Sequence, residues 1–387
     1  MNSKTFCAAT WTHLDITSTG TLQPCCVWNY SGSEAETESY YFTEFDQWLN
    51  SAKMKTIRKD LHNGQARKEC NHCYKLDQSN ITSQRVIYNA QFARYNDYSM
   101  LDTETWTANP DELLSIDLKL GNLCDLKCVM CNGRNSSQIM TEYKLHKARF
   151  DEIEGTALRN ADDNFKWPLS DEFKQFISRF KSNLKDIKMT GGEPTIIPYV
   201  IEFLESIEAP EEVTLNLVTN ASSYNEKLFN VISKFKLVNI AISLEGIGEA
   251  NELLRFNSEW AIIVENIARY KAMPNVCVTI THVIQAFSVA TVIPLIKWCE
   301  EQGLRLALGV LNSPKNFRLD SVPLERIEQF IAELNQLKNT ITRNRNAVES
   351  IIDIAKKCKY DPLLETSRKK YTILLDDLRK TKLSSII

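Results

Sequence analysis

The chain has 387 residues, of which 43% are hydrophobic and 25% charged, and its net charge is −3. This length suits one α/β domain with a smaller module, and the composition is that of a globular protein. The slightly acidic charge balance argues against a broad nucleic-acid-binding surface. No apolar run is long enough to cross a bilayer and the first residues lack a signal-peptide core, so we expect a cytoplasmic protein with no membrane partner.

Eleven cysteines are distributed unevenly along the chain. Five of them lie in the first fifth of the sequence: Cys7, Cys25, Cys26, Cys70 and Cys73. In a reducing compartment, clustered cysteines bind metals more often than they form disulfides. A four-cysteine set with one C-x2-C pair could hold zinc, which His13 or His72 could join, or an iron–sulfur cluster.

A regular pattern begins after a polar segment at residues 79–112, which we interpret as a connector. Leu114, Ile116 and Leu118 alternate with Ser115 and Asp117, which predicts a strand. Further strands are predicted at residues 184–189, 213–218, 238–243, 276–281 and 304–309. Helix-period segments separate these strands, so residues 113–315 predict a parallel sheet of six βα units in an incomplete barrel. Functional residues are then expected at the carboxyl ends of the strands.

Three more cysteines follow the first strand of this domain, and Cys124, Cys128 and Cys131 have the spacing C-x3-C-x2-C. Soft thiolate ligands select zinc, copper(I) or iron–sulfur clusters. Structural zinc sites favour four ligands built from C-x2-C pairs, so the triplet fits zinc poorly. Three protein ligands on a four-iron cluster leave one iron open to a reactant.

The triplet resembles the cluster loop of the radical S-adenosylmethionine (SAM) superfamily, and the resemblance extends over residues 114–313. It implies a (βα)6 partial barrel in which Cys124, Cys128 and Cys131 hold a [4Fe-4S] cluster whose fourth iron binds SAM. Reductive cleavage of SAM would give a 5′-deoxyadenosyl radical that abstracts hydrogen from the substrate. A flavodoxin or ferredoxin is the implied reductant. Met130 stands where relatives often carry an aromatic residue near the adenine.

The second predicted strand ends in a short motif that supports this resemblance. Gly191, Gly192, Glu193 and Pro194 match the family segment that binds the amino group of SAM. Glycine also permits a positive φ or a close backbone approach at such a turn, so the segment by itself is compatible with an ordinary turn.

The third predicted strand ends in Thr219 and Asn220, where relatives carry T-N-G, but Ala221 replaces the glycine. The resemblance implies that Thr219 and Asn220 also contribute to the SAM site.

The fourth predicted strand ends in Ser243, which the resemblance places near the SAM ribose, with Arg255 at the SAM carboxylate. Glu245 replaces the aspartate of the family motif. His282 and Gln285 follow the fifth strand and could face the same pocket.

The amino-terminal cysteines fit a second family pattern. Cys7-x12-Gly20-x4-Cys25, followed by Cys70-x2-Cys73, resembles the SPASM and twitch modules, which hold auxiliary [4Fe-4S] clusters. The later cysteines of a full SPASM domain do not follow, so we expect one auxiliary cluster. The implied ligands are Cys7, Cys25, Cys70 and Cys73, with Cys26 as an alternative. Relatives usually carry this module after the barrel, whereas here residues 1–78 precede it.

The remaining sequence has few chemical signals. Residues 316–387 predict one or two covering helices, and we expect Cys277, Cys299 and Cys358 to pack as small apolar side chains.

The whole chain therefore predicts a radical SAM enzyme of the oxidoreductase or rearrangement type. Its cofactors would be SAM, a SAM-binding [4Fe-4S] cluster and an auxiliary cluster. Modification of a peptide or protein is the first hypothesis for its reaction. Oxidation or rearrangement of a small molecule such as a sugar or nucleotide is the second, and a non-catalytic zinc-binding interaction protein is the third. No catalytic acid or base is assigned.

Overall fold

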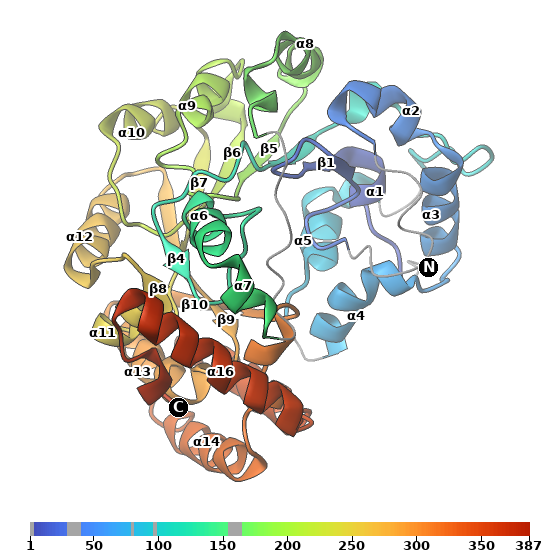
Figure 1. The fold of residues 1–387 in the computed structure, drawn as a ribbon. Helices are drawn as coiled ribbons and strands as arrows, with labels where there is room; N and C mark the ends of the chain where they lie inside the picture. The colour runs from blue at the N-terminus through green and yellow to red at the C-terminus, as the bar shows by residue number, and fades with distance from the viewer. Residues whose placement is uncertain (1–3, 29–39, 79–80, 96–98, 154–164) are drawn as a thin grey trace. The chain divides into compact units, whose positions relative to one another are not determined.

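The computed structural model describes residues 4–28, 40–78, 81–95, 99–153 and 165–387 (Figure 1). The chain forms two compact units that are interleaved in sequence. The first unit comprises residues 1–121, 164–216 and 227–238, and the second comprises residues 122–163, 217–226 and 239–387. Part of the predicted connector, residues 79–80 and 96–98, lies outside the described residues.

The strands form an eight-stranded sheet in the order β10-β9-β7-β6-β5-β3-β1-β2. Their bounds are β1 His13–Ile16, β2 Leu22–Gln23, β3 Ser115–Leu118, β5 Asp186–Met189, β6 Thr214–Thr219, β7 Leu237–Ser243, β9 Val276–Ile284 and β10 Arg305–Val310. Strand β3 is parallel to both β1 and β5, and β9 is parallel to β10, whereas the edge strand β2 is antiparallel to β1. The six predicted strands of the α/β domain are confirmed as β3, β5, β6, β7, β9 and β10.

Strand β1 is an addition that the sequence did not predict. Its four residues belong to the cysteine-rich segment, yet they pair in register with β3, Asp15 opposite Asp117. A four-residue strand is too short to show a clear period-2 pattern, so its pairing partner could not be read locally. The amino-terminal module thereby extends the sheet of the first unit by β1 and β2.

Helices alternate with the later strands, as expected for βα units. In chain order the helices are α1 Ala9–Thr12, α2 Phe45–Leu49, α3 Ala52–His62, α4 Asn71–Gln78, α5 Gln84–Gln91, α6 Ser137–Leu145, α7 Lys147–Asp151, α8 Asp171–Phe180, α9 Pro198–Glu205, α10 Glu226–Ile232, α11 Gly248–Leu254, α12 Trp260–Lys271, α13 Ser288–Glu301, α14 Leu324–Leu337, α15 Arg345–Lys356 and α16 Pro362–Arg379. The predicted inward faces of α9 and α10 are buried, including Val200, Leu204, Leu228 and Ile232. None of the helices in the described ranges has the length and apolar character needed to cross a membrane.

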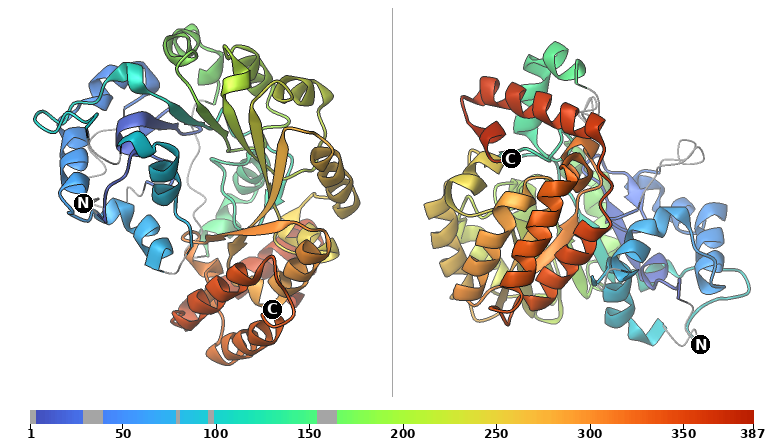
Figure 2. Two further views of the ribbon diagram at one scale, coloured as in Figure 1. Left: turned by 180° about the vertical axis from the view of Figure 1, so that it is seen from behind. Right: turned by 90° about the horizontal axis from the view of Figure 1, so that it is seen from below.

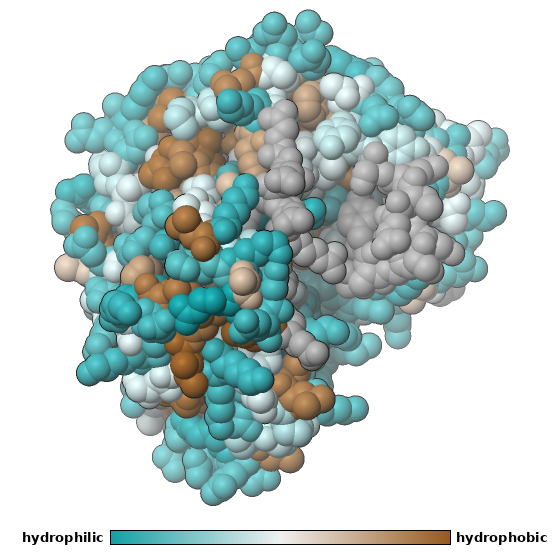
Figure 3. Space-filling view, viewed as in Figure 1, coloured by the Kyte–Doolittle hydropathy of each residue, from teal (hydrophilic) through white to brown (hydrophobic). Residues whose placement is uncertain are grey.

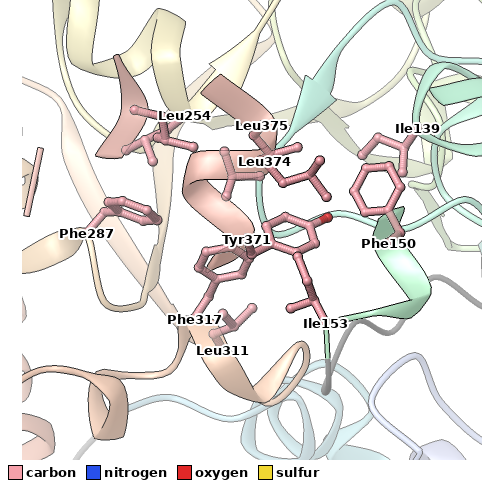
Figure 4. Close-up of a cluster of buried hydrophobic side chains, with 12 residues drawn as sticks. Ile139, Phe150, Ile153, Leu254, Phe287, Leu311, Phe317, Tyr371, Leu374 and Leu375 are labelled. Carbon is pink, nitrogen blue, oxygen red and sulfur yellow. The ribbon is translucent and has the colours of Figure 1, made fainter. Parts of the chain in front are cut away.

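The carboxyl-terminal segment contains three helices, so the prediction of one or two was wrong (Figure 2). The break between α14 and α15 lies in a segment without glycine or proline, which left no local stop signal. Helix α16 contributes Tyr371, Leu374 and Leu375 to the hydrophobic core of the second unit, where they meet Phe317 and Phe150 (Figure 4). Val129, from the cysteine loop, belongs to the same core.

The three isolated cysteines differ in their surroundings. Cys299 is buried on α13 as expected and Cys358 is half-buried. Cys277 is exposed, so the expectation that it packs in the core was wrong. Cys277 lies near the start of β9, on the face of the strand opposite to the buried Ile280. The visible surface in Figure 3 is largely hydrophilic, with hydrophobic residues in small groups.

Arg58 on α3 holds the amino-terminal module together. It is fully buried, and its Nε donates to the carbonyl of Thr10 at 2.9 Å while Nη2 donates to that of Leu49 at 2.7 Å. Its Nη1 donates to the carbonyl of Trp106 at 3.0 Å, and the guanidinium lies 5.2 Å from the centre of the Trp11 ring. One side chain therefore satisfies carbonyl groups from three separate segments.

We expect Arg58→Met to lower the free energy of unfolding by about 3–5 kcal/mol, because each buried carbonyl left without a donor costs about 1–3 kcal/mol. Denaturant unfolding of the reconstituted protein measures this change. The exposed neighbour Lys59 on the same helix provides the control, Lys59→Met, which should change the free energy by less than about 0.5 kcal/mol. Equal effects of the two substitutions would contradict this role of Arg58.

Candidate active site

The cysteine triplet lies in the second unit, in a loop that includes the short strand β4 (Lys127–Cys128). Cys124, Leu126 and Cys128 form one buried cluster against which Met130 and Cys131 pack. Burial raises the pKa of all three thiols, to about 12 for Cys131, and the neighbouring sulfurs add to the effect for Cys124 and Cys131. The three thiols thus share a site with little water, where a metal rather than solvent would have to stabilise the thiolates.

Hydrogen bonds from several elements hold the backbone of this loop. The Asp125 carboxylate accepts from Asn220 Nδ2 at 2.9 Å and from the hydroxyl of Ser222. The Asp125 carbonyl accepts from Asn257 Nδ2 at 3.2 Å. Ser136 donates to the carbonyl of Leu126 at 2.8 Å. Asn220, predicted to serve the SAM site, therefore positions the cysteine loop, and Asp125 is a site residue that the motif comparison missed although it lies between two of the cysteines.

A carboxyl-terminal arginine supports the loop from α16. Arg379 donates to the Glu142 carboxylate at 2.7 and 3.1 Å, and to the carbonyl of Lys127 at 2.9 Å. Its guanidinium lies 5.2 Å from the centre of the Phe256 ring. Arg379 and Glu142 are both buried, so this pair fixes α16 against β4 and the adjacent strand β8 (Arg255–Phe256). Nothing in the local sequence around residue 379 indicated this contact.

Arg255 lies directly across from the triplet, because β8 pairs with β4 and places Arg255 opposite Cys128. Its Nη1 is 3.7 Å from Oε1 of Glu245, and its buried Nε has no hydrogen-bond partner among the described residues. Gln285 Nε2 donates to the Glu245 carboxylate at 3.2 Å. A buried guanidinium with a free donor beside three thiols can bind an anionic group such as a carboxylate.

His282 belongs to the same buried region but is occupied by protein partners. Its Nδ1 is 3.0 Å from the carbonyl of Leu244 and its Nε2 is 2.8 Å from the hydroxyl of Ser288. Burial lowers the pKa of His282 to about 4, which keeps the ring neutral. Both ring nitrogens are used, so His282 orders this region and is unsuited to contact a ligand.

The glycine-rich turn after β5 belongs to the first unit. Gly191 and Gly192 have φ values of 73° and 57°, and a Cβ on Gly191 would lie 2.8 Å from Cβ of Lys119. Both the left-handed backbone and the close approach therefore require glycine. Glu193 is buried, and its carboxylate accepts from the backbone and the hydroxyl of Thr195 at 3.1 and 2.7 Å. Pro194 is buried beside it.

The other motif residues lie at strand ends of the second unit, as the sequence predicted. Thr219 ends β6, and its hydroxyl accepts from the amide of Ala221 at 3.0 Å. Ala221 has a φ of 56°, so it adopts the left-handed conformation for which relatives use glycine. Ser243 ends β7 and is half-buried.

The amino-terminal thiols lie in the first unit. Cys7 interacts electrostatically with Cys70 and Cys73, and Cys25 interacts with Cys26, Cys7 and Cys73. Burial raises the pKa of each of these thiols, to about 12 for Cys7 and Cys70. The four implied ligands are thus linked by electrostatic interactions in one unit.

Cys26 has a different environment from its neighbour Cys25. Its sulfur accepts from Lys188 Nζ at 3.3 Å, and its other charged neighbours are Asp117, Asp15 and Lys119. His13, the alternative zinc ligand, has Nδ1 at 2.7 Å from Ser115 and Nε2 at 3.0 Å from the hydroxyl of Tyr88. Cys26 and His13 therefore each have protein partners, Lys188 for Cys26 and Ser115 and Tyr88 for His13.

In the part of the chain that the structure describes, no three His, Cys, Asp or Glu side chains converge closely enough to hold a single metal ion. A four-iron cluster does not require such convergence, because each cysteine binds a different iron.

Two family models match the chain, each over a range that contains one of the cysteine groups. A family model described as the radical SAM superfamily matches residues 118–299, and one described as an iron–sulfur cluster-binding domain, SPASM, matches residues 7–74. A curated relative, the uncharacterized protein MJ0907 of Methanocaldococcus jannaschii, is 25% identical over 149 residues, 38% of this chain and 43% of the relative. The chain thus spans less than half of that relative.

Solved structures also resemble the chain. Native anSMEcpe with bound AdoMet has a TM-score of 0.40 and 16% identity, over 60% of this chain and 63% of that one. SuiB of Streptococcus suis bound to S-adenosylmethionine has a TM-score of 0.39 and 14% identity, over 88% of this chain and 70% of that one.

Because the Cys26 sulfur accepts from Lys188, we expect the alanine variants of Cys25 and Cys26 to differ in iron content. Two four-iron clusters give about eight irons per chain. We expect Cys26→Ala to retain about eight and Cys25→Ala to fall toward about four, since only the latter loses a ligand of a four-cysteine site. Iron and sulfide analysis after anaerobic reconstitution measures this. The reverse order of the two variants would show that Cys26 is the ligand.

The raised pKa of Glu245 makes the free energy of unfolding depend on pH. Burial raises its pKa to about 7, and Arg255 offsets only part of that rise. The folded protein therefore holds a proton that the unfolded chain releases near pH 4.5, the ordinary pKa of a glutamate, so stability falls as pH rises from 4.5 to about 7. Without SAM, we expect the difference in free energy of unfolding between Glu245→Gln and the unsubstituted protein to shift by about 2 kcal/mol in favour of Glu245→Gln as the pH rises from 5.5 to 8.

Unfolding midpoints across this pH range measure the effect. Glu249→Gln, at an exposed position on α11, controls for general loss of negative charge. A difference between Glu245→Gln and the unsubstituted protein that does not change with pH would contradict the prediction.

Proposed function

The chain belongs to the radical SAM superfamily and carries a SPASM iron–sulfur domain ahead of the barrel, and from this premise we propose that it removes hydrogen from a peptide or protein side chain. The superfamily fixes the cofactors, a [4Fe-4S] cluster with SAM and an auxiliary iron–sulfur cluster. The choice of a peptide substrate rests on the resemblance of residues 7–74 to the module that many peptide-modifying members carry.

The residues of the second unit fit the SAM-binding cluster. Cys124, Cys128 and Cys131 supply three soft ligands from one buried loop, which leaves one iron for the cofactor. When bound, the cluster and SAM supply a 5′-deoxyadenosyl radical, and the auxiliary cluster supplies an electron acceptor or donor. Arg255, with its free Nε facing the triplet from β8, binds the SAM carboxylate and orients the cofactor.

The remaining residues position these groups. Asp125, held by Asn220 and Ser222, sets the path of the loop between the first two cysteines, and Arg379 fixes its outer side. Met130 packs against the cysteine cluster and offers an apolar surface to the adenine. Thr219 and Ser243, at the ends of β6 and β7 in the same unit, complete the part of the cofactor site that this unit carries.

In the first unit, Cys7, Cys25, Cys70 and Cys73 hold the auxiliary cluster. Their common burial and mutual proximity support this assignment, and Arg58 stabilises the segment that carries them. The observation that carries the proposal as a whole is the cysteine triplet with the buried Arg255 opposite Cys128, whose Nε has no hydrogen-bond partner among the described residues.

Reductive cleavage of SAM tests the proposal. We expect dithionite-reduced, reconstituted protein to release 5′-deoxyadenosine, and Cys128→Ala to lower the rate by at least about 100-fold, because losing a ligand exceeds the ~10–100-fold cost of losing an outer-shell partner. Cys277→Ala is the matched control, since Cys277 is exposed and isolated from the other cysteines. Undiminished release from Cys128→Ala would show that the triplet does not hold the reactive cluster.

A further inference from the structure

One face of β1, β3 and β5 in the first unit carries a row of charged side chains. Asp15 on β1 lies opposite Asp117 on β3, which lies opposite Lys188 on β5. Lys119 follows two residues after Asp117 and so lies on the same face, beyond the end of β3. The alternate positions, such as Ile116 and Ile187, are apolar and buried on the other face of the sheet.

The four charges form two ion pairs. Lys119 Nζ donates to Oδ1 of Asp15, and Lys188 Nζ lies 3.1 Å from Oδ2 of Asp117. The hydroxyl of Thr190 donates to the other Asp117 oxygen at 3.3 Å. Although burial works to lower the pKa values of both lysines, the nearby carboxylates raise them, so both ammonium groups stay charged.

The pairs are buried unequally. The Asp15 and Asp117 side chains have 0% exposed area, whereas those of Lys119 and Lys188 have 18% and 21%. The accessible part of the row is therefore cationic. Each ammonium has three N–H donors, and the contacts described above use one on Lys119 and two on Lys188.

Two buried carboxylate oxygens of the row accept no hydrogen bond within the described residues, and one of them, Asp117 Oδ2, lies 3.1 Å from Lys188 Nζ as an ion pair. The other is Oδ2 of Asp15. A buried acceptor without a donor is unfavourable for the folded state. Buried ion pairs are also no more stabilising than well-packed apolar residues, so stability alone does not account for this row.

We propose that Asp15, Asp117, Lys119 and Lys188 form the substrate-binding site for a carboxylate group, so that the substrate is an acidic peptide. The two ammonium groups bind the carboxylate of a substrate Asp or Glu side chain. The buried carboxylates hold the lysines in place. This inference rests on the proposed function and names its substrate class.

The location of the row agrees with this role. It lies at the carboxyl ends of β3 and β5, where functional residues gather in such barrels, and Gly191 packs against Lys119. Lys188 also contacts Cys26, the residue next to the auxiliary ligand Cys25. A substrate anchored by Lys188 would therefore be held beside the auxiliary-cluster cysteines of the same unit.

A matched pair of probes tests the proposal: the blocked peptides acetyl-Ala-Glu-Ala-amide and acetyl-Ala-Gln-Ala-amide, which differ in one carboxylate. Equilibrium dialysis against the reconstituted protein, under anaerobic conditions with SAM present, gives their affinities. We expect the Glu peptide to bind about tenfold more tightly or better, the effect of charge-assisted hydrogen bonds. Equal affinities would overturn the proposal.

Removing one charge of a buried pair strands the other and could unfold the protein. The decisive variant is therefore the double substitution Lys188→Met with Asp117→Asn, which removes a whole pair and should abolish the preference for the Glu peptide. Lys174→Met, at an exposed lysine on α8, should retain it. A double variant that keeps the preference, or that loses SAM affinity in the same proportion, would show that the row does not bind the substrate carboxylate.

Separate measurements test the enzymatic activity and the carboxylate site. If the unsubstituted protein releases no 5′-deoxyadenosine, the proposed function is wrong. If it releases 5′-deoxyadenosine but does not distinguish the two peptides, only the inferred carboxylate site is wrong.

Discussion

The exclusion of water from the cysteine sulfurs is the constraint on which the rest of this structure depends. Thiols at such positions are costly to ionise, so their thiolates become stable only when iron replaces the protons. A loop that must gather three thiols before any metal stabilises it needs support from elsewhere. Asp125 receives that support from the ends of the neighbouring strands, and Arg379 brings it from a helix more than 200 residues away in sequence.

The carboxyl-terminal helices share a hydrophobic core with the cysteine loop of the second unit. The core that contains Tyr371 and Leu375 (Figure 4) also contains Val129, and Met130 and Cys131 pack against it. Packing of α16 and the path of the cysteine loop are therefore energetically linked. Helices that look like a simple cover in the sequence are part of the support of the proposed cluster.

In the first unit, the amino-terminal module and the sheet form a continuous structure through β1. The polar face of β1 and β3 places His13, Asp15, Ser115 and Asp117 in register, so the strand from the cysteine module contributes one of the four side chains of the charged row. The amino-terminal module precedes the barrel in the sequence but still packs directly against it, because β1 pairs with the first barrel strand, β3.

The sequence alone was sufficient for the strand and helix pattern of the barrel and for the family, because period-2 alternation and cysteine spacing are local properties. It could not show that β1 pairs with β3, that Arg379 donates to the carbonyl of Lys127, or that the Cys26 sulfur accepts from Lys188. Those facts depend on contacts between residues distant in the chain, whose pairing is decided by packing and burial. The same reason explains Ala221, where the local motif suggested a lost glycine but the fold imposes the left-handed backbone on alanine.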